Sequence, residues 1–238
     1  MGVSPSELLA GRWRLLNDDQ SKLRRHLIDP DFRVGLDSVA KTLGHDAAPV
    51  LRRHAFLLLQ PDCMARQMAN RCLELVETEG FAPVRSLRLR LRVDMVRRLW
   101  KARSSDWTPN SNVIAELICT RGESVLVILA DTTAELREPA SVRLRRFKCP
   151  AQPEARSRHS LRPLFGAAGP LVVLVHTSDE PLDLIRESAI FAGEPAQEPF
   201  ATMLLGTEAA TCRERILADA AQLQRDAEAH DLDTRTLP

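Results

Sequence analysis

The order of apolar and polar positions predicts alternating strands and helices over residues 53–193. The continuous apolar runs at 54–59 and 124–129 are typical of strands buried on both faces, and residues 171–175 form another such run. Residues 84–93 instead alternate apolar with mostly arginine side chains, which predicts a strand with one face in water. We interpret these arginines as a solvated sheet face or a subunit contact rather than a polyanion-binding stripe, because few aromatic residues accompany them.

Apolar residues at helical spacing fall between and after these strands. The helices predicted in this way cover residues 64–79, 94–103, 113–120, 133–147 and 181–191. Gly80 fits the C-terminal cap of the first helix, and Pro139 should disturb the fourth. Four strands with two crossover helices fit a ferredoxin-like α/β sandwich, a βαββαβ unit with a four-stranded antiparallel sheet.

We expect three parts in the chain. The α/β domain at 53–193 follows a helical N-terminal extension at 1–52 and precedes a helical C-terminal extension at 194–238. Within the α/β domain, residues 149–170 are predicted to form a loop rich in proline, arginine and alanine. A loop of about 20 residues in a compact domain is usually functional or an assembly contact.

Turn and capping residues place the helices of the two extensions. Ser6 is expected to cap a first helix, the Asp29-Pro30 pair to break the chain, and residues 36–43 to form a short helix that ends at Gly44. After a proline-containing linker, a helix is predicted over 208–230.

Composition narrows the class of protein. The chain has 238 residues with 33 basic and 32 acidic side chains, so a globally basic nucleic-acid binder and a protein with a globally acidic tail are excluded. Its apolar runs are shorter than the about 20 residues that span a bilayer, and no secretory signal is visible, so we expect no membrane partner. The five cysteines show no pairing or metal-ligand spacing, which favours a reducing cytoplasm and no protein-bound metal.

One imidazole stands out in this pattern. His176 ends the fourth predicted strand, and Ser178 and Asp179 can cap the helix that begins at Pro181, whose N-terminus suits a phosphate. Glu187 follows eleven residues after His176 on that helix. If strand and helix fold back together, its carboxylate would fix the ring tautomer and favour the nucleophilic nitrogen. The plainer interpretation is a capped strand-to-helix turn that contains a histidine.

Four motifs, in the expected order, resemble those of nucleoside diphosphate kinases over roughly residues 54–191. The family's Lys-Pro-Asp-Ala-Val-x-Arg-Gly is similar to Gln-Pro-Asp-Cys-Met-Ala-Arg-Gln at 60–67, and its Arg-x-x-x-Gly-x-Thr-Asn-Pro to Arg-Arg-Phe-Lys-Cys-Pro-Ala-Gln-Pro at 145–153. Its Thr-Ile-Arg-Gly-Asp-Phe is similar to Ser-Leu-Arg-Pro-Leu-Phe at 160–165. Its His-Gly-Ser-Asp signature, with a glutamate eleven residues after the histidine, resembles His-Thr-Ser-Asp at 176–179 followed by Glu187.

The resemblance implies a phosphotransferase that works through a phosphohistidine. In the family, the histidine takes the γ-phosphoryl of one nucleotide and gives it to a diphosphate; His176 matches this nucleophile. Glu187 matches the group that holds the other ring nitrogen, Ser178 the supporting hydroxyl, and Arg145 and Arg162 the phosphate-binding arginines. The resemblance further implies Mg²⁺ with a nucleoside triphosphate as cofactor, a nucleotide or phosphorylated small molecule as partner, no nucleic acid, and a homo-oligomer, dimer or higher.

The chain departs from the family at several polar positions. The family's lysine is Gln60 here, its threonine is Ala151, and the asparagine three residues before the histidine is Val173. The glycine after the histidine is Thr177, and the chain has no tyrosine, so the family's active-site tyrosine is absent. Gln60 and Asp179 remain in the predicted nucleotide- and phosphate-binding set.

Three interpretations therefore stay open: a phosphotransferase with altered nucleotide or acceptor specificity in a specialised biosynthetic pathway, a degenerate nucleotide- or phosphate-binding protein, and a structural or interaction module. Joint retention of His176, Ser178 and Glu187 favours the first, whereas the neutral Gln60 favours the second. Trp100 or the preceding leucine is expected near the position of the missing tyrosine.

Overall fold

The computed structural model describes most of the chain. The described residues are 16, 19–101, 108–148, 160–164, 174–192, 200–205 and 209–227. The predicted helix capped by Ser6, residues 149–159 and 165–170 of the predicted loop, most of the strand at 171–175 and the linker after 193 lie outside them. No helix in the described part of the chain is both long enough and apolar enough to cross a membrane.

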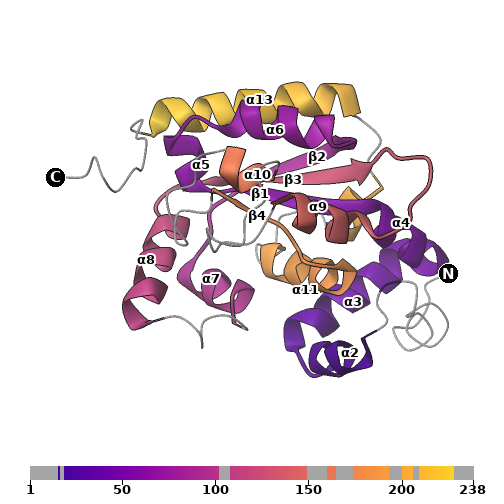
Figure 1. Ribbon diagram of the computed structural model, residues 1–238. Helices are drawn as coiled ribbons and strands as arrows, with labels where there is room; N and C mark the ends of the chain where they lie inside the picture. The colour runs from indigo at the N-terminus through magenta and orange to yellow at the C-terminus, as the bar shows by residue number, and fades with distance from the viewer. Residues whose placement is uncertain are drawn as a thin grey trace.

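A four-stranded antiparallel sheet forms the centre of the molecule (Figure 1). Its strands are β1 (His54–Leu59), β2 (Phe81–Leu89), β3 (Ser124–Asp131) and β4 (Val175–His176), in the spatial order β2-β3-β1-β4. β1 pairs with both β3 and β4, and β2 pairs with β3, always antiparallel. This arrangement confirms the ferredoxin-like α+β fold that the sequence predicts.

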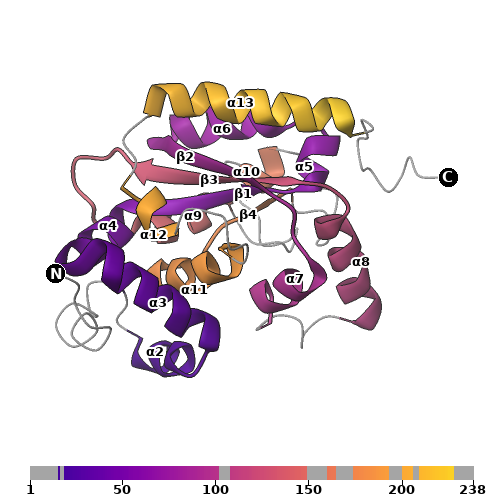
Figure 2. The same ribbon diagram turned by 180° about the vertical axis from the view of Figure 1, so that it is seen from behind.

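Helices cover the sheet and flank it (Figures 1 and 2). They are α2 (Gln20–Leu27), α3 (Pro30–Leu43), α4 (Ala47–Arg53), α5 (Pro61–Ala65), α6 (Ala69–Thr78), α7 (Val93–Leu99), α8 (Pro109–Thr120), α9 (Ala140–Lys148), α10 (Leu161–Leu164), α11 (Pro181–Phe191), α12 (Phe200–Met203) and α13 (Ala209–Asp226), with a 3₁₀ turn at Gly44–Asp46. In both views α6 and α13 lie along one face of the sheet, and α3 and α11 lie toward the other.

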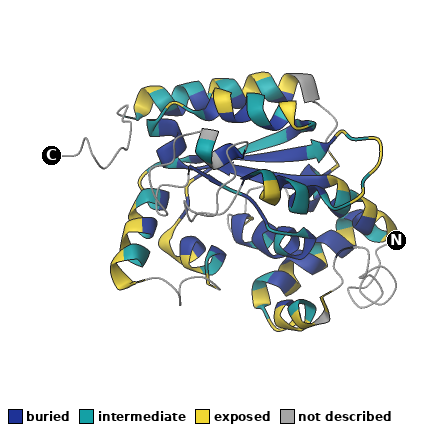
Figure 3. Ribbon diagram, viewed as in Figure 1, coloured by how far each residue is buried: buried dark blue, intermediate teal, exposed yellow. Residues whose placement is uncertain are grey.

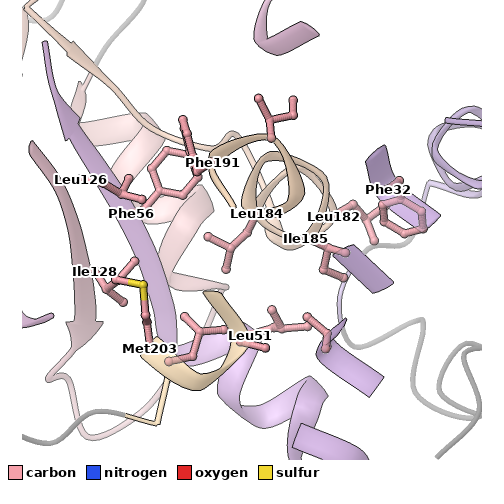
Figure 4. Packing of buried hydrophobic residues seen from close by; sticks show 14 of the residues in the cluster. Phe32, Leu51, Phe56, Leu126, Ile128, Leu182, Leu184, Ile185, Phe191 and Met203 are labelled. Carbon is pink, nitrogen blue, oxygen red and sulfur yellow. The ribbon is translucent and has the colours of Figure 1, made fainter. Parts of the chain in front are cut away.

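The side chains of β1 alternate between two hydrophobic clusters, one on each face of the sheet. Phe56 and Leu58 belong to the cluster formed with α3, α7 and α11, whereas Leu57 and Leu59 belong to the one formed with α6, α9 and α13. All six residues of β1 are buried, which explains why the strand reads as a continuous apolar run (Figure 3). Figure 4 shows the first cluster, with Phe56 against Phe191 of α11.

Helix α3 lies directly against α11. At Gly35 an added Cβ would come within 2.0 Å of the backbone oxygen of Ile185, so the two helix backbones can approach this closely only because Gly35 has no side chain. Leu36 and Val39 of α3 belong to the same hydrophobic cluster as Phe56. Residues that precede the sheet in sequence therefore help to form its core.

Some helix boundaries differ from the predictions. Asp29-Pro30 separates α2 from α3, as predicted, but α3 begins directly at Pro30 instead of at residue 36. The Asp29 carboxylate accepts a hydrogen bond from the Asp31 amide at 2.9 Å, and proline occupies the first turn. The helix predicted at 64–79 is two helices, α5 and α6, separated at Gln67, whose φ is 55°. Gly80, with φ of 79°, ends α6 as predicted.

The predictions for the fourth and fifth helices need similar corrections. α9 begins at Ala140 instead of residue 133, because Pro139 stands directly before it. A short helix, α10, lies inside the segment 149–170 that was predicted as loop. The helix predicted at 181–191 and the strand predicted at 54–59 have the expected bounds.

The arginine-bearing face of β2 was predicted to be solvated. In the structure it is partly covered, because α13 packs over β2. β2 also ends at Leu89, and α7 begins at Val93, within the predicted strand. Arg88 forms an ion pair with Glu123, with 2.6 Å between Nη2 and Oε2. The hydrogen bond to Glu123, and then the carboxylates of Asp219 and Asp226 on α13, raise the pKa of Arg88. Helix α13 thus partly covers Arg88, whereas Arg90 and Arg92 follow β2 and are exposed, as the solvated interpretation predicts.

Candidate active site

His176 faces the side of the sheet that α11 and α7 cover. In β4 it lies opposite Leu58 of β1, and directly opposed residues of antiparallel strands point to the same face. Leu58 belongs to the cluster shared with α11, so His176 points toward that helix. The side chain of His176 is 13% exposed, so it is largely enclosed while part of it remains accessible.

The carboxylate of Glu187 joins the two hydrogen-bonding side chains of this site. Its Oε2 atom lies 3.1 Å from Nε2 of His176 and accepts a hydrogen bond from Oγ of Ser178, also at 3.1 Å. Since an ionised carboxylate can only accept hydrogen bonds, Nε2 carries the proton in this contact. The lone pair of the neutral ring is then on Nδ1. The three residues predicted as the catalytic set thus lie together.

Ser178 and Asp179 do not cap α11, in contrast to the sequence-based expectation. The N-cap residue is Glu180, and no side chain caps the helix through a hydrogen bond. Ser178 cannot serve as the cap because its hydroxyl is directed to Glu187 instead. The loop after β4 is therefore built to hold the Glu187 carboxylate, and the 1% exposure of Ser178 shows how tightly that loop is enclosed.

Two aromatic rings flank the imidazole. Trp100, which follows α7, meets the ring of His176 edge-on, with 5.3 Å between the centroids, and Phe56 of β1 lies 5.8 Å away at a tilt of 46°. Phe56 in turn packs edge-on against Phe191, the last residue of α11. Of the two residues expected near the missing tyrosine, Trp100 is the one in contact with the imidazole. These rings restrict the orientation of the imidazole.

Gln60 lies at the end of β1, fully buried. Its backbone amide donates to the carbonyl of Leu174, two residues before His176, at 3.0 Å. The side-chain Nε2 contacts Sγ of Cys119 on α8 at 3.7 Å, while Oε1 has no hydrogen-bond partner. Burial, and secondarily the charge of Asp62, raise the pKa of the Cys119 thiol to about 12, so the thiol stays neutral. Gln60 is therefore near the strand that bears His176, with its neutral side-chain amide against a neutral thiol.

Helix α9 brings two positive charges to the site. Arg145 Nε lies 3.9 Å from Oδ1 of Asp179, and Lys148 Nζ lies 3.7 Å from the same oxygen. Lys148 also donates to the carbonyl of Thr177 at 3.2 Å. Residues 145 and 148 are three apart and share one side of the helix. The sequence analysis missed Lys148, although its spacing from Arg145 was a visible signal.

The other predicted arginine lies partly outside the described structure. The backbone of Arg162 is in α10, but its side chain lies outside the described residues, as do Ala151 and Val173. The adjoining Ser160 and Leu161 are buried. The structure therefore brings together His176, Ser178 and Glu187, and it pairs Arg145 with Asp179 on the loop that follows His176. Gln60 lies nearby, directly after β1.

The described residues fit a magnesium ion that arrives on phosphate oxygens better than one held by a protein cage. Mg²⁺ usually keeps several waters and takes one or two carboxylates plus substrate phosphates. Asp179 is the partly exposed carboxylate of the site, at 32%, while Glu187 is engaged by His176 and Ser178. Asp179 is thus the carboxylate that could contact such an ion, in exchange for its pairing with Arg145 and Lys148.

Among the described residues, one other cluster has ligands suited to a metal: His26, Glu180 and Asp183, at the start of α11. The ammonium of Lys22 lies between its two carboxylates, 2.8 Å from Glu180 and 3.0 Å from Asp183. Nε2 of His26 lies 3.3 Å from Asp183. This cluster is an ion-paired junction between α2 and α11 in which a lysine already supplies the positive charge.

Comparison with solved structures identifies similar folds. The chain is similar to nucleoside diphosphate kinase from Encephalitozoon cuniculi, with 16% identity and a TM-score of 0.50 over 61% of this chain and 92% of that one. It also matches the enzyme from Aquifex aeolicus (20% identity, TM-score 0.47, 59% of this chain and 96% of that one) and a nucleoside diphosphate kinase family protein from Babesia bovis (15%, 0.48, 64% and 99%). No protein-family model and no curated protein sequence matches the chain.

The similarity to the Encephalitozoon cuniculi structure concerns the fold of the protein. The described sheet and its flanking helices have the architecture of a nucleoside diphosphate kinase, as the motifs in the sequence predict. At 16% identity the likeness describes the fold alone, and the chemistry of the protein depends on the residues of its own site.

Proposed function

We propose that the protein is a histidine phosphotransferase in which His176 accepts a phosphoryl group from a nucleoside triphosphate and passes it to a second acceptor. The observation that carries this proposal is the shared oxygen of Glu187, which engages Nε2 of His176 and the hydroxyl of Ser178 at 3.1 Å each. A carboxylate that fixes the proton on one ring nitrogen makes the other nitrogen the nucleophile.

In the proposed reaction, the lone pair of Nδ1 attacks the terminal phosphorus. The N–P bond forms as the bond from phosphorus to the bridging oxygen breaks, and the nucleoside diphosphate leaves with that electron pair. The proton on Nε2 stays in its hydrogen bond to Glu187, whose negative charge stabilises the more electron-poor ring. In the second half, an acceptor oxygen attacks the phosphohistidine and Nδ1 recovers its lone pair.

The remaining residues of the site would bind and orient the phosphates. Arg145 is half-exposed on α9 and can form charge-assisted hydrogen bonds to phosphate oxygens. Mg²⁺, when bound with the nucleotide, would neutralise part of the phosphate charge, and Asp179 is a partly exposed carboxylate that could contact it. Trp100 would exclude water from one side of the ring.

The second candidate is a protein that binds a nucleotide or phosphate ligand without turnover. The neutral, fully buried Gln60 favours it, because the family motif has a lysine there. Loss of one electrostatic donor commonly slows a reaction about 10²–10³-fold. Altered specificity, a homo-oligomer and a cytoplasmic location remain predictions of the sequence.

The test is transfer of label from γ-labelled ATP or GTP with Mg²⁺ to the pure protein, followed by a chase with unlabelled nucleoside diphosphates. The phosphotransferase predicts acid-labile, alkali-stable label that is lost in His176→Ala and moves to the acceptor during the chase. Nucleotide binding without label would favour the binding protein. If the protein shows no nucleotide binding and no label, both candidate functions are contradicted.

A further inference from the structure

Lys148 combines a full positive charge with burial beside the loop that follows His176. Of the four lysines in the chain it is the buried one, at 6% exposure, while Lys41 of α3 has a side chain that is 78% exposed. Lysine is rarely buried unless its charge is paired, because removing an ammonium from water is costly. A buried lysine at this position therefore calls for a compensating interaction or a function.

The contacts of Lys148 are directed to the loop between β4 and α11. Its Nζ donates to the carbonyl of Thr177, the residue after His176, at 3.2 Å, and lies 3.7 Å from the carboxylate of Asp179. Thr177 is fully buried, and Ser178, between these two contacts, donates to Glu187. Lys148 thus contacts the residues on both sides of Ser178, whose hydroxyl supports the Glu187 carboxylate.

The residue that follows β1 supplies no charge to this site. Gln60, where the resembling motif has lysine, is a neutral amide in contact with a thiol. A phosphoryl group on His176 would add roughly two negative charges to a site that already holds the buried Glu187 carboxylate. The like charges repel each other, so a positive charge is needed to offset the repulsion. A buried cation interacts strongly in such a place because water screens it little.

We infer that Lys148 is a positioning residue of the site that holds the Thr177–Asp179 loop and supplies, from α9, a positive charge that favours the phosphorylated form of His176. The inference rests on the proposed role of His176 as a phosphoryl carrier. Lys148 acts through the loop and through its field, and Arg145 on the same side of α9 remains the phosphate-binding side chain.

The test uses phosphoramidate, a phosphoryl donor that reacts with histidine without a nucleotide. Its P–N bond breaks, ammonia leaves, and the N–P bond forms on the imidazole. We expect Lys148→Met to slow phosphorylation of His176 about tenfold or more, and Lys148→Arg to stay near the wild-type rate, because arginine keeps the charge. Lys41→Met is the matched control for loss of a lysine charge elsewhere and should react like wild type.

Urea unfolding separates this role from a purely structural one. Lys148→Met removes the donor of the buried Thr177 carbonyl and one ionic partner of Asp179, so we expect its unfolding midpoint to fall. The phosphorylation rates are therefore compared without urea, where the unfolding curves show wild type and both variants to be folded. A folded Lys148→Met protein that reacts at the wild-type rate overturns the inference. So does a Lys148→Arg protein that reacts no faster than Lys148→Met.

Comparing phosphoramidate with a nucleoside triphosphate as the phosphoryl donor separates a failure of this inference from a failure of the proposed function. Wild-type labelling by phosphoramidate but not by nucleoside triphosphates would contradict the proposed function, and the rates of the Lys148 variants would still decide the inference. If only the nucleoside triphosphate labels wild-type His176, the proposed function stands and the rates of the same variants with that donor decide the inference. If neither donor labels wild-type His176, both are overturned.

Discussion

Glu187 and His176 are eleven residues apart in sequence and come into contact because α11 folds back along the face of the sheet to which β4 directs His176. The contact joins Nε2 to Oε2 at 3.1 Å, and the same oxygen accepts from Ser178. Two donors on one oxygen fix both the position of the carboxylate and the tautomer of the ring. The chemistry of the site depends on that geometry.

Glu187→Gln should slow phosphorylation of His176 on the order of 10²-fold or more, because the amide no longer fixes the proton on Nε2 or stabilises the positive ring. The fold should persist, since the two side chains have nearly the same shape. Glu74→Gln, on a side chain of α6 that is 43% exposed, is the matched control and should react like wild type. Rates of label incorporation measure the effect, and a wild-type rate for Glu187→Gln would contradict the assigned role.

Gly35→Ala should destabilise the protein by about 1–3 kcal/mol, because the new methyl group would meet the Ile185 carbonyl and force α3 away from α11. Gly122→Ala is the control: its Cβ would make an ordinary 3.4 Å contact with Pro61, so little change is expected. Urea unfolding followed by circular dichroism gives both values. Equal stability of the two variants would show that the helices do not pack as closely as described.

The junction of α2 and α11 should be sensitive to acid. Burial by itself raises the pKa of Asp183, but the hydrogen bond from His26 and the charge of Lys22 outweigh it, so that this pKa lies below its ordinary value. A carboxyl group with a lowered pKa stabilises the fold above its unfolded pKa of about 3.9, and the contribution disappears as the pH falls through the folded value.

Asp183→Asn should therefore cost about 2 kcal/mol at pH 7, and the difference from wild type should shrink as the pH falls from about 5 toward 3. Asp37→Asn, on an exposed side chain paired with Lys41 at 3.7 Å, should change little at any pH. Unfolding midpoints across this pH range are the measurement. A difference that stays constant with pH would contradict the ionic role of Asp183.

Trp100 should report on the state of His176. Its indole contacts the imidazole edge-on at 5.3 Å, so a phosphoryl group on the ring places negative charge within reach of the fluorophore. We expect tryptophan emission to change when wild-type protein is phosphorylated, and most of that change to be lost in Trp100→Phe, which keeps an aromatic wall. A full change in Trp100→Phe would mean that another tryptophan is the reporter.

The sequence predicts the central elements well because their signals are local. Residues 54–59 read as a buried strand since both faces of β1 are covered, and α11 begins at Pro181, which suits a first helical turn. The spacing of His176 and Glu187 suggested contact, but only the tertiary fold shows that the two side chains meet.

The features that could not be predicted from the sequence depend on contacts between distant segments. The arginines of β2 read as solvated because nothing local indicates that α13 covers them. A serine in this position is typical of a helix cap, yet the Ser178 hydroxyl donates its hydrogen bond to Glu187 instead. Burial of Lys148 is equally invisible, since a lysine on a short helix ordinarily reaches water.

The most direct test of the account is ³¹P NMR of the protein after incubation with Mg²⁺ and a nucleoside triphosphate. Because Nε2 is held by Glu187, the account predicts a phosphoramidate signal from phosphate on Nδ1 of a histidine, absent in His176→Ala. A phosphate on Nε2, a signal that survives in His176→Ala, or no phosphohistidine signal at all would contradict it.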